Sequence, residues 1–133
     1  MTPKEYLNQA YYIDRRIAID LEKIEAMKSS LHGYPDFRMD GIRRESTGNA
    51  MEQTILKVLE YEERINADID RLIDKKKEIE NVIGDVQDSR LREILTRRYL
   101  LFQKWEHIAS EMHTDLSWVF RLHKRALDKI VIK

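Results

Sequence analysis

The residues best suited to chemistry form a row of basic and polar side chains near the C-terminus. If Val119 marks the buried face of a helix here, a rotation of 100° per residue places several such side chains on the opposite face. They are Ser117, Arg121, Lys124 and Asp128, with Arg125 beside them. A guanidinium can hydrogen-bond guanine O6 and N7 together, and cationic side chains neutralise phosphates. The row therefore has the chemistry expected of a surface that binds duplex DNA.

Within this row we expect different roles. Arg121 is the best candidate to read a base, and Ser117 lies near the start of the helix, where bases come closest. Lys124 and Arg125 are better placed for phosphates, which position a protein without reading sequence.

Three more side chains border the row. Trp118 either touches a thymine methyl or lies at the edge of the core or of a protein contact, whereas Phe120, on the other side, is expected at the core edge. Lys104, at the start of the preceding helix, completes the expected DNA contacts. The expected DNA-binding set is therefore Lys104, Ser117, Trp118, Arg121, Lys124 and Arg125.

Catalytic and metal chemistry has little support. The four histidines, His32, His107, His113 and His123, form no metal-binding spacing. Cysteine is absent, which excludes thiolate sites and fits a reducing compartment. The many acidic residues pair with basic ones at four-residue spacing, as Glu60 does with Arg64, and such pairs need no catalytic explanation. We expect no enzyme activity, cofactor, metal or small-molecule substrate.

Two helices joined by a tight turn must position the basic row. Apolar side chains at helical spacing line one face of each: Ile108, Ala109 and Met112, then Val119, Leu122, Ala126 and Ile130. Between them, Asp115 can cap the second helix by accepting its free backbone N–H groups. This is the layout of a helix-turn-helix, whose second helix normally enters the DNA major groove.

The same apolar residues resemble the fourth conserved region of bacterial sigma factors, which reads the −35 promoter element. The run Ile108-Ala109, Met112, Val119, Leu122 and Ala126-Leu127 falls on that family's hydrophobic skeleton. The sequence REILTRRYL at 92–100 resembles the helix that precedes it there. The chain is most similar to small sigma-like regulators of phages and prophages of Gram-positive bacteria, related to the ArpU and RinA activators. The specific part covers residues 88–130, about a third of the chain.

Some positions depart from that family. His113 replaces the usual turn glycine, although histidine tolerates a left-handed backbone, and Lys104 replaces a Ser or Thr. The second helix opens with Leu116, Ser117, Trp118 and Phe120 where sigma factors carry base-contacting Arg and Glu. Nothing resembles the sigma region that melts the −10 element. The resemblance therefore implies a regulator of phage or prophage promoters, with RNA polymerase as a candidate partner, and not a complete sigma factor.

The N-terminal half is predicted to form long helices. Thr2, Pro3 and Glu5 form a helix start with a capping box. One apolar stripe then follows at helical spacing, and the helix should end near His32-Gly33. The stripe comprises Tyr6, Ala10, Ile13, Ile17, Leu21, Ile24, Met27 and Leu31. Residues 33–49 hold three of the four glycines and a proline, and we expect a loop or partly disordered linker there.

A second long helix should begin with Asn49 as its cap. Its predicted seam alternates steps of four and three residues, as in a coiled coil. The seam comprises Met51, Ile55, Val58, Glu62, Ile65, Ile69, Leu72, Lys76, Ile79, Ile83 and Val86. We expect an all-α chain: a long antiparallel, coiled-coil-like hairpin at 1–87, followed by a helix-turn-helix domain at 88–133. The apolar surface of the hairpin exceeds what that small domain can cover, which predicts a homo-oligomer.

Charge and hydropathy fit this organisation. The net charge is zero, but residues 88–133 hold ten Lys and Arg against six Asp and Glu, and residues 1–87 hold fourteen against eighteen. A basic C-terminal part is expected of a domain that binds DNA phosphates. No apolar run approaches the ~20 residues of a membrane span and no signal peptide is evident, so we expect no membrane association and a cytoplasmic protein.

Two readings compete with a transcription regulator. Small terminase subunits of phages also join a helix-turn-helix to a helical oligomerisation region, and they recognise packaging sites instead of promoters. A coiled-coil adaptor whose C-terminal domain binds only protein is the other alternative.

Overall fold

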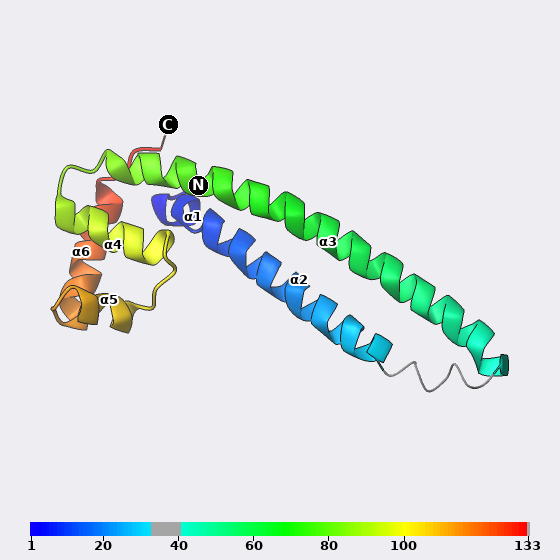
Figure 1. The fold of residues 1–133 in the computed structure, drawn as a ribbon. Helices are drawn as coiled ribbons and strands as arrows, with labels where there is room; N and C mark the ends of the chain where they lie inside the picture. Colours follow the sequence, from blue (N-terminus) through cyan, green and yellow to red (C-terminus); the bar gives the residue numbers. More distant parts are fainter. Residues whose placement is uncertain (33–40, 133) are drawn as a thin grey trace. The chain divides into compact units, whose positions relative to one another are not determined.

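The computed structural model describes residues 1–32 and 41–132, with side chains for residues 1–31 and 50–132. The helices are α1 (Pro3–Leu7), α2 (Gln9–His32), α3 (Gly41–Gly84), α4 (Ser89–Tyr99), α5 (Trp105–Glu111) and α6 (Leu116–Asp128) (Figure 1). No strand occurs among the described residues, so the all-α prediction is confirmed. The chain forms two compact units, one of Met1–Ile13 with Arg71–Lys133 and one of Asp14–Asp70.

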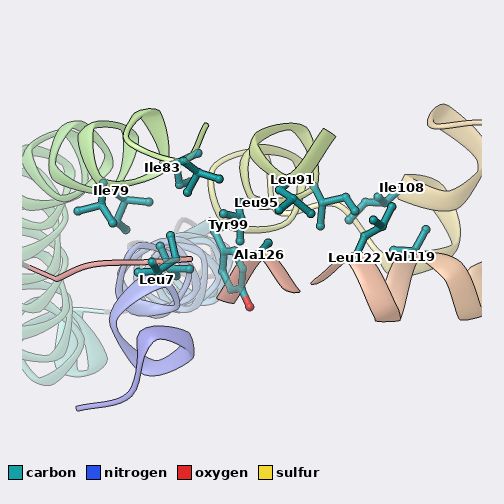
Figure 2. Close-up of a cluster of buried hydrophobic side chains, with 14 of the residues drawn as sticks. Leu7, Ile79, Ile83, Leu91, Leu95, Tyr99, Ile108, Val119, Leu122 and Ala126 are labelled. Carbon is teal, nitrogen blue, oxygen red and sulfur yellow. The ribbon is translucent and has the colours of Figure 1, made fainter. Parts of the chain in front are cut away.

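This division differs from the predicted boundary between residues 87 and 88. Leu7, Ala10 and Ile79 are fully buried in the same cluster as side chains of α4, α5 and α6 (Figure 2). Three short helices cannot bury all their apolar faces against one another. The start of the chain and the end of α3 therefore complete their core.

The N-terminal helix begins as predicted. The Thr2 hydroxyl accepts a hydrogen bond from the Glu5 backbone N–H at 3.2 Å, and Pro3 occupies the first turn. The expected unbroken helix is, however, divided at Asn8 into α1 and α2. The predicted end near His32 is confirmed.

The start of the second long helix was predicted wrongly. Helix α3 begins at Gly41, so Asn49 lies within it and does not cap it. Residues 41–49 of the predicted loop are helical, and residues 33–40 lie outside the described part of the chain. No proline occurs between residues 41 and 84, so nothing in the sequence forces the helix to stop at the local capping signal. Helix α3 ends at Gly84.

In the unit Asp14–Asp70, α2 and α3 form the predicted antiparallel hairpin (Figure 1). Arg16 pairs with Asp68, and Asp20 pairs with Arg64, so positions rise along one helix as they fall along the other. Between the helices lies a small apolar core. Its members are Ile24, Val58 and Ile65, bordered by Ile17, Met27 and Tyr61.

The face that α3 turns toward α2 differs in part from the predicted seam. Ile65 is buried as predicted, but the inner positions around it are Tyr61 and Asp68 and not their neighbours Glu62 and Ile69. Ile69 is 40% exposed, whereas Asp68 is 1% exposed. A buried carboxylate at a seam position is tolerated because an arginine of α2 pairs with it.

The other unit has a single apolar core (Figure 2). Helix α4 buries Leu91, Ile94, Leu95 and Tyr99 on one face. Asp88 caps α4 by accepting the backbone N–H of Arg90 at 2.9 Å. This core holds α5 and α6, which carry most of the candidate site.

Candidate nucleic-acid interface

Most of the predicted hydrophobic skeleton of the helix-turn-helix is buried, while Met112 and Leu127 are half-buried. Ile108 and Ala109 from α5, and Val119, Leu122 and Ala126 from α6, lie in the same cluster as the inner face of α4 (Figure 2). Ala109 is small where α5 approaches its neighbours. The skeleton therefore fixes which face of α6 remains available to solvent.

The turn between α5 and α6 is closed by its backbone. His113 has φ 53°, in the left-handed region, where the resembled family usually has glycine. The backbone N–H of Thr114 donates to the Ala109 carbonyl at 3.0 Å. The tight turn expected between the two helices is thus present, with histidine in the strained position.

Asp115 caps α6 as predicted. Its carboxylate accepts the backbone N–H of Trp118 at 2.8 Å and the hydroxyl of Ser117 at 3.0 Å. These hydrogen bonds, the backbone one first, lower the pKa of Asp115 below its usual value of 3.8. The ionised cap therefore sets where α6 begins and which residue enters its first turn.

Five of the six predicted DNA contacts lie together on α6. Ser117, Arg121, Lys124 and Arg125 are exposed, and Trp118 is half-buried. The sixth, Lys104, is exposed at the start of α5. Lys104 occupies the N-cap position of α5, but its side chain makes no capping hydrogen bond.

The cations on α6 are not neutralised by carboxylates. In the described part of the chain, Arg121, Lys124 and Arg125 form no ion pair. By contrast, Arg97 on α4 is paired with Glu93 at 2.8 Å. Unpaired cations on one helix face are free to neutralise phosphates.

Trp118 supports two of these cations. Its ring packs against the core cluster, and the guanidinium carbons of Arg121 and Arg125 lie 6.0 and 5.7 Å from the ring centroid. Of the alternatives left open for Trp118, the edge of the core describes its place in the fold. Contact with an aromatic face restrains a guanidinium without consuming its hydrogen-bond donors.

Ser117 and Phe120 are less available than the sequence indicates. The Ser117 hydroxyl is engaged by the Asp115 carboxylate, so base contact requires it to accept while donating to the cap. Phe120 meets Trp105 edge to face at 5.4 Å between centroids and is still 45% exposed. It therefore borders the core, as expected, but leaves part of its ring on the surface.

A buried polar pair beneath α6 was not predicted. The Tyr99 hydroxyl and His123 Nε2 lie 2.6 Å apart, and the Trp105 ring is 4.6 Å from the imidazole. The guanidinium carbon of Arg98 lies 4.5 Å from the centroid of the Trp105 ring. Tyr99 and His123 are 24 residues apart in the sequence, so no local pattern indicates their hydrogen bond.

Burial controls the protonation of this pair. It raises the pKa of Tyr99 to about 12 and lowers the pKa of His123 to about 4. The positive charges of Lys4 and Arg98 also lower the pKa of His123. His123 is therefore neutral near pH 7, and its tautomer decides whether Nε2 accepts the phenol hydrogen or donates to the phenol oxygen. The pair joins α4 to α6 and stabilises the orientation of α6.

Among the described residues, no group of histidine, aspartate and glutamate side chains is arranged to hold a metal ion. None of the helices described is apolar and long enough to cross a bilayer. Comparison with protein-family models, curated proteins and solved structures finds no match to this chain.

Proposed function

We propose that this chain is a DNA-binding transcription regulator of phage or prophage type. Helix α6 reads duplex DNA in the major groove, and the α2–α3 hairpin serves assembly. The observation that carries the proposal is the exposed, unpaired row Arg121, Lys124 and Arg125 on a capped helix that follows a tight turn. A helix presented in this way is the recognition element of helix-turn-helix proteins.

Each side chain has a role set by its position. Arg121, restrained on Trp118, reads a guanine through O6 and N7. Lys124 and Arg125, one turn further along α6, neutralise phosphates, and Lys104 at the start of α5 does the same. Ser117 lies closest to the bases at the start of the helix.

The likeness of residues 88–130 to sigma region four supports a promoter as the target. In this proposal the chain acts in the cytoplasm on phage or prophage promoters and contacts RNA polymerase there. A small-terminase-like packaging protein would use the same α6 surface on another DNA site, whereas a coiled-coil adaptor would use it on protein.

One experiment tests the proposal directly. Selection of bound sequences from a random duplex library measures the sequence preference. Fluorescence anisotropy of the selected duplexes, labelled and titrated over a salt series, measures how strongly binding depends on salt. We expect an enriched motif and a binding constant that falls steeply with salt. No detectable binding at low salt would remove the DNA-reading role. Co-purification with RNA polymerase, against assembly into rings, separates the regulator from the terminase-like alternative.

A further inference from the structure

Large apolar side chains remain exposed along one face of α3 in the hairpin unit. Ile55 is 45% exposed, Leu59 is 52% exposed and Ile69 is 40% exposed. Glu62 and Asn66, also exposed, complete the row at alternating steps of four and three residues. Positions with this spacing form a continuous stripe along a helix, and we call this row the outer stripe.

The outer stripe is distinct from the face that holds the hairpin together. That inner face carries Val58, Ile65 and Asp68, all of them buried. Leu59, Asn66 and Ile69 of the outer stripe each follow an inner-face residue directly, so each lies about 100° around the helix from it. The hairpin can therefore be formed while the outer stripe stays open to a partner.

The outer stripe is self-complementary. Leu59 lies five residues before position 64 and Ile69 five residues after it, while Glu62 and Asn66 lie two residues before and after. If two copies of α3 meet antiparallel on a two-fold axis through this position, Leu59 of one faces Ile69 of the other. Glu62 of one then faces Asn66 of the other, and both pairs occur twice.

We propose that the outer stripe binds a second copy of this chain, α3 against α3, in this antiparallel register. The facing Leu59 and Ile69 side chains exclude water. The Glu62 carboxylate accepts a hydrogen bond from the Asn66 amide of the second copy, which satisfies both groups. This deepens the assembly role in the proposed function and rests on it.

The polar positions select this register over its neighbours. A shift of the pairing by one heptad sets Glu62 against Leu59 of the second copy and leaves its carboxylate without an amide. An unpaired carboxylate in an apolar seam is unfavourable, so the shifted pairing is disfavoured. A partner with an unrelated sequence would have to reproduce both the spacing and the amide.

Ile65 and Ile69 provide a matched test, because one lies inside the hairpin and the other on the outer stripe. Sedimentation equilibrium of the full chain at tens of micromolar, without DNA, measures assembly, and circular dichroism measures helix content. We expect wild type to be dimeric, Ile69→Asp to weaken dimerisation by about tenfold or more with helix content retained, and Ile65→Asp to lose helix. Ala67→Asp, nearly opposite Ile69 on α3, should stay dimeric.

The register is tested by cross-linking, which does not depend on the aspartate variants folding. The chain has no cysteine, so single introduced thiols are unambiguous. A mixture of Leu59→Cys chains with differently tagged Ile69→Cys chains should form the mixed disulfide on mild oxidation. Ile69→Cys alone should not, because its two copies lie ten residues apart in this register, about 15 Å along the helix.

Three results would overturn the proposal: a wild-type monomer at this concentration, an Ile69→Asp variant that dimerises as wild type does, or a homotypic Ile69→Cys disulfide that outcompetes the mixed one. Since none of these measurements includes DNA, a monomer that still binds duplex DNA would remove this inference and the assembly role of the hairpin, and would keep the DNA-binding role. A dimer that fails to bind DNA would instead keep it and remove the DNA-binding role.

Discussion

Asp20 on α2 accepts two hydrogen bonds from the guanidinium of Arg64 on α3, at 2.5 and 2.8 Å. A second pair runs the other way, from Arg16 on α2 to Asp68 on α3 at 2.7 Å. Each helix supplies an arginine followed four residues later by an aspartate, so we call these the crossed ion pairs. Both carboxylates are nearly inaccessible, so sliding one helix along the other would bury them away from these donors.

The first prediction concerns the crossed ion pairs. Arg64→Ala leaves the buried Asp20 carboxylate without its donor, whereas Asp20→Leu leaves a half-exposed arginine that water can solvate. We therefore expect Arg64→Ala to lower the free energy of unfolding more than Asp20→Leu does. Urea unfolding followed by circular dichroism measures both. Lys57→Ala, which breaks only the exposed pair with Glu60, should change stability by less than about 0.5 kcal/mol.

The same pair has a defined pH dependence. The hydrogen bond from Arg64 lowers the pKa of Asp20 below 3.8. Its contribution to stability is therefore present above that pH and is lost as pH falls through the lower, folded-state value. The stability difference between wild type and Arg64→Ala should shrink as pH is lowered from about 5 to about 2. A difference that stays constant over this range would contradict the assignment.

The second prediction concerns His123. Its folded-state pKa of about 4 lies below the usual 6.5, so between these values the unfolded chain binds a proton that the folded chain excludes. Wild type should lose up to about 3 kcal/mol of stability as pH falls from 6.5 to 4, and this term should lose no more below that.

Two histidine variants provide the controls for this prediction. His123→Gln retains a partner for the Tyr99 hydroxyl but cannot titrate, so its stability should depend much less on pH in this window. His107→Gln, at an exposed position, should behave as wild type does. Equal pH profiles for wild type and His123→Gln, measured by urea unfolding, would show that the buried imidazole is not responsible.

The third prediction concerns the cationic row on α6. Lys124→Ala and Arg125→Ala should weaken binding to all duplexes alike and reduce the slope of log K against log salt by about one unit each. Arg121→Ala should cost about 1–3 kcal/mol at the selected site and relax the preference at one base pair. None should unfold the protein, because all three side chains are exposed.

Arg15→Ala is the matched control for these variants, since Arg15 is exposed on α2 and its removal changes the net charge equally. It should bind DNA as wild type does in the same anisotropy titrations. If Arg15→Ala weakens binding as much as Arg125→Ala, the effect follows overall charge and not the face of α6.

The fourth prediction concerns the start of α6. Asp115→Ala removes the acceptor for the Trp118 backbone N–H, so the first turn, which carries Ser117, should fray. We expect a lower melting temperature and weaker site-specific binding, with most of both restored in Asp115→Ser, which caps without the charge. Hydrogen exchange at the Trp118 amide should be faster in Asp115→Ala. An unchanged exchange rate there would show that the cap is dispensable.

The hairpin was predictable except where it buries charge. The sequence predicted Ile69, and not its neighbour Asp68, at the seam, because a buried carboxylate is unfavourable unless it has a partner. That partner, Arg16, lies on the other helix, so no local sequence pattern predicts the pair. The extension of α3 to Gly41 was missed for a related reason, since a capping signal permits a helix to begin but does not prevent it from continuing.

The helix-turn-helix was easier to predict because its determinants are local. The Asp115 cap acts within three residues, and the apolar skeleton repeats within each helix. The hydrogen bond between Tyr99 and His123 was not predictable in the same way, because it depends on how α4 and α6 pack. The exposed row on α6 could be named in advance, but the restraint of Arg121 and Arg125 on Trp118 could not.

The chain has two tryptophans, and they occupy different environments. Trp105 lies 4.6 Å from His123, while Trp118 lies beneath the two arginines of the proposed DNA face. Protonated imidazole quenches indole emission, so a Trp118→Phe chain would signal the charge state of His123 by the brightness of Trp105. A Trp105→Phe chain would signal instead the approach of a nucleic acid to Trp118. The protein thus contains its own pair of optical reporters, one for its interior and one for its surface.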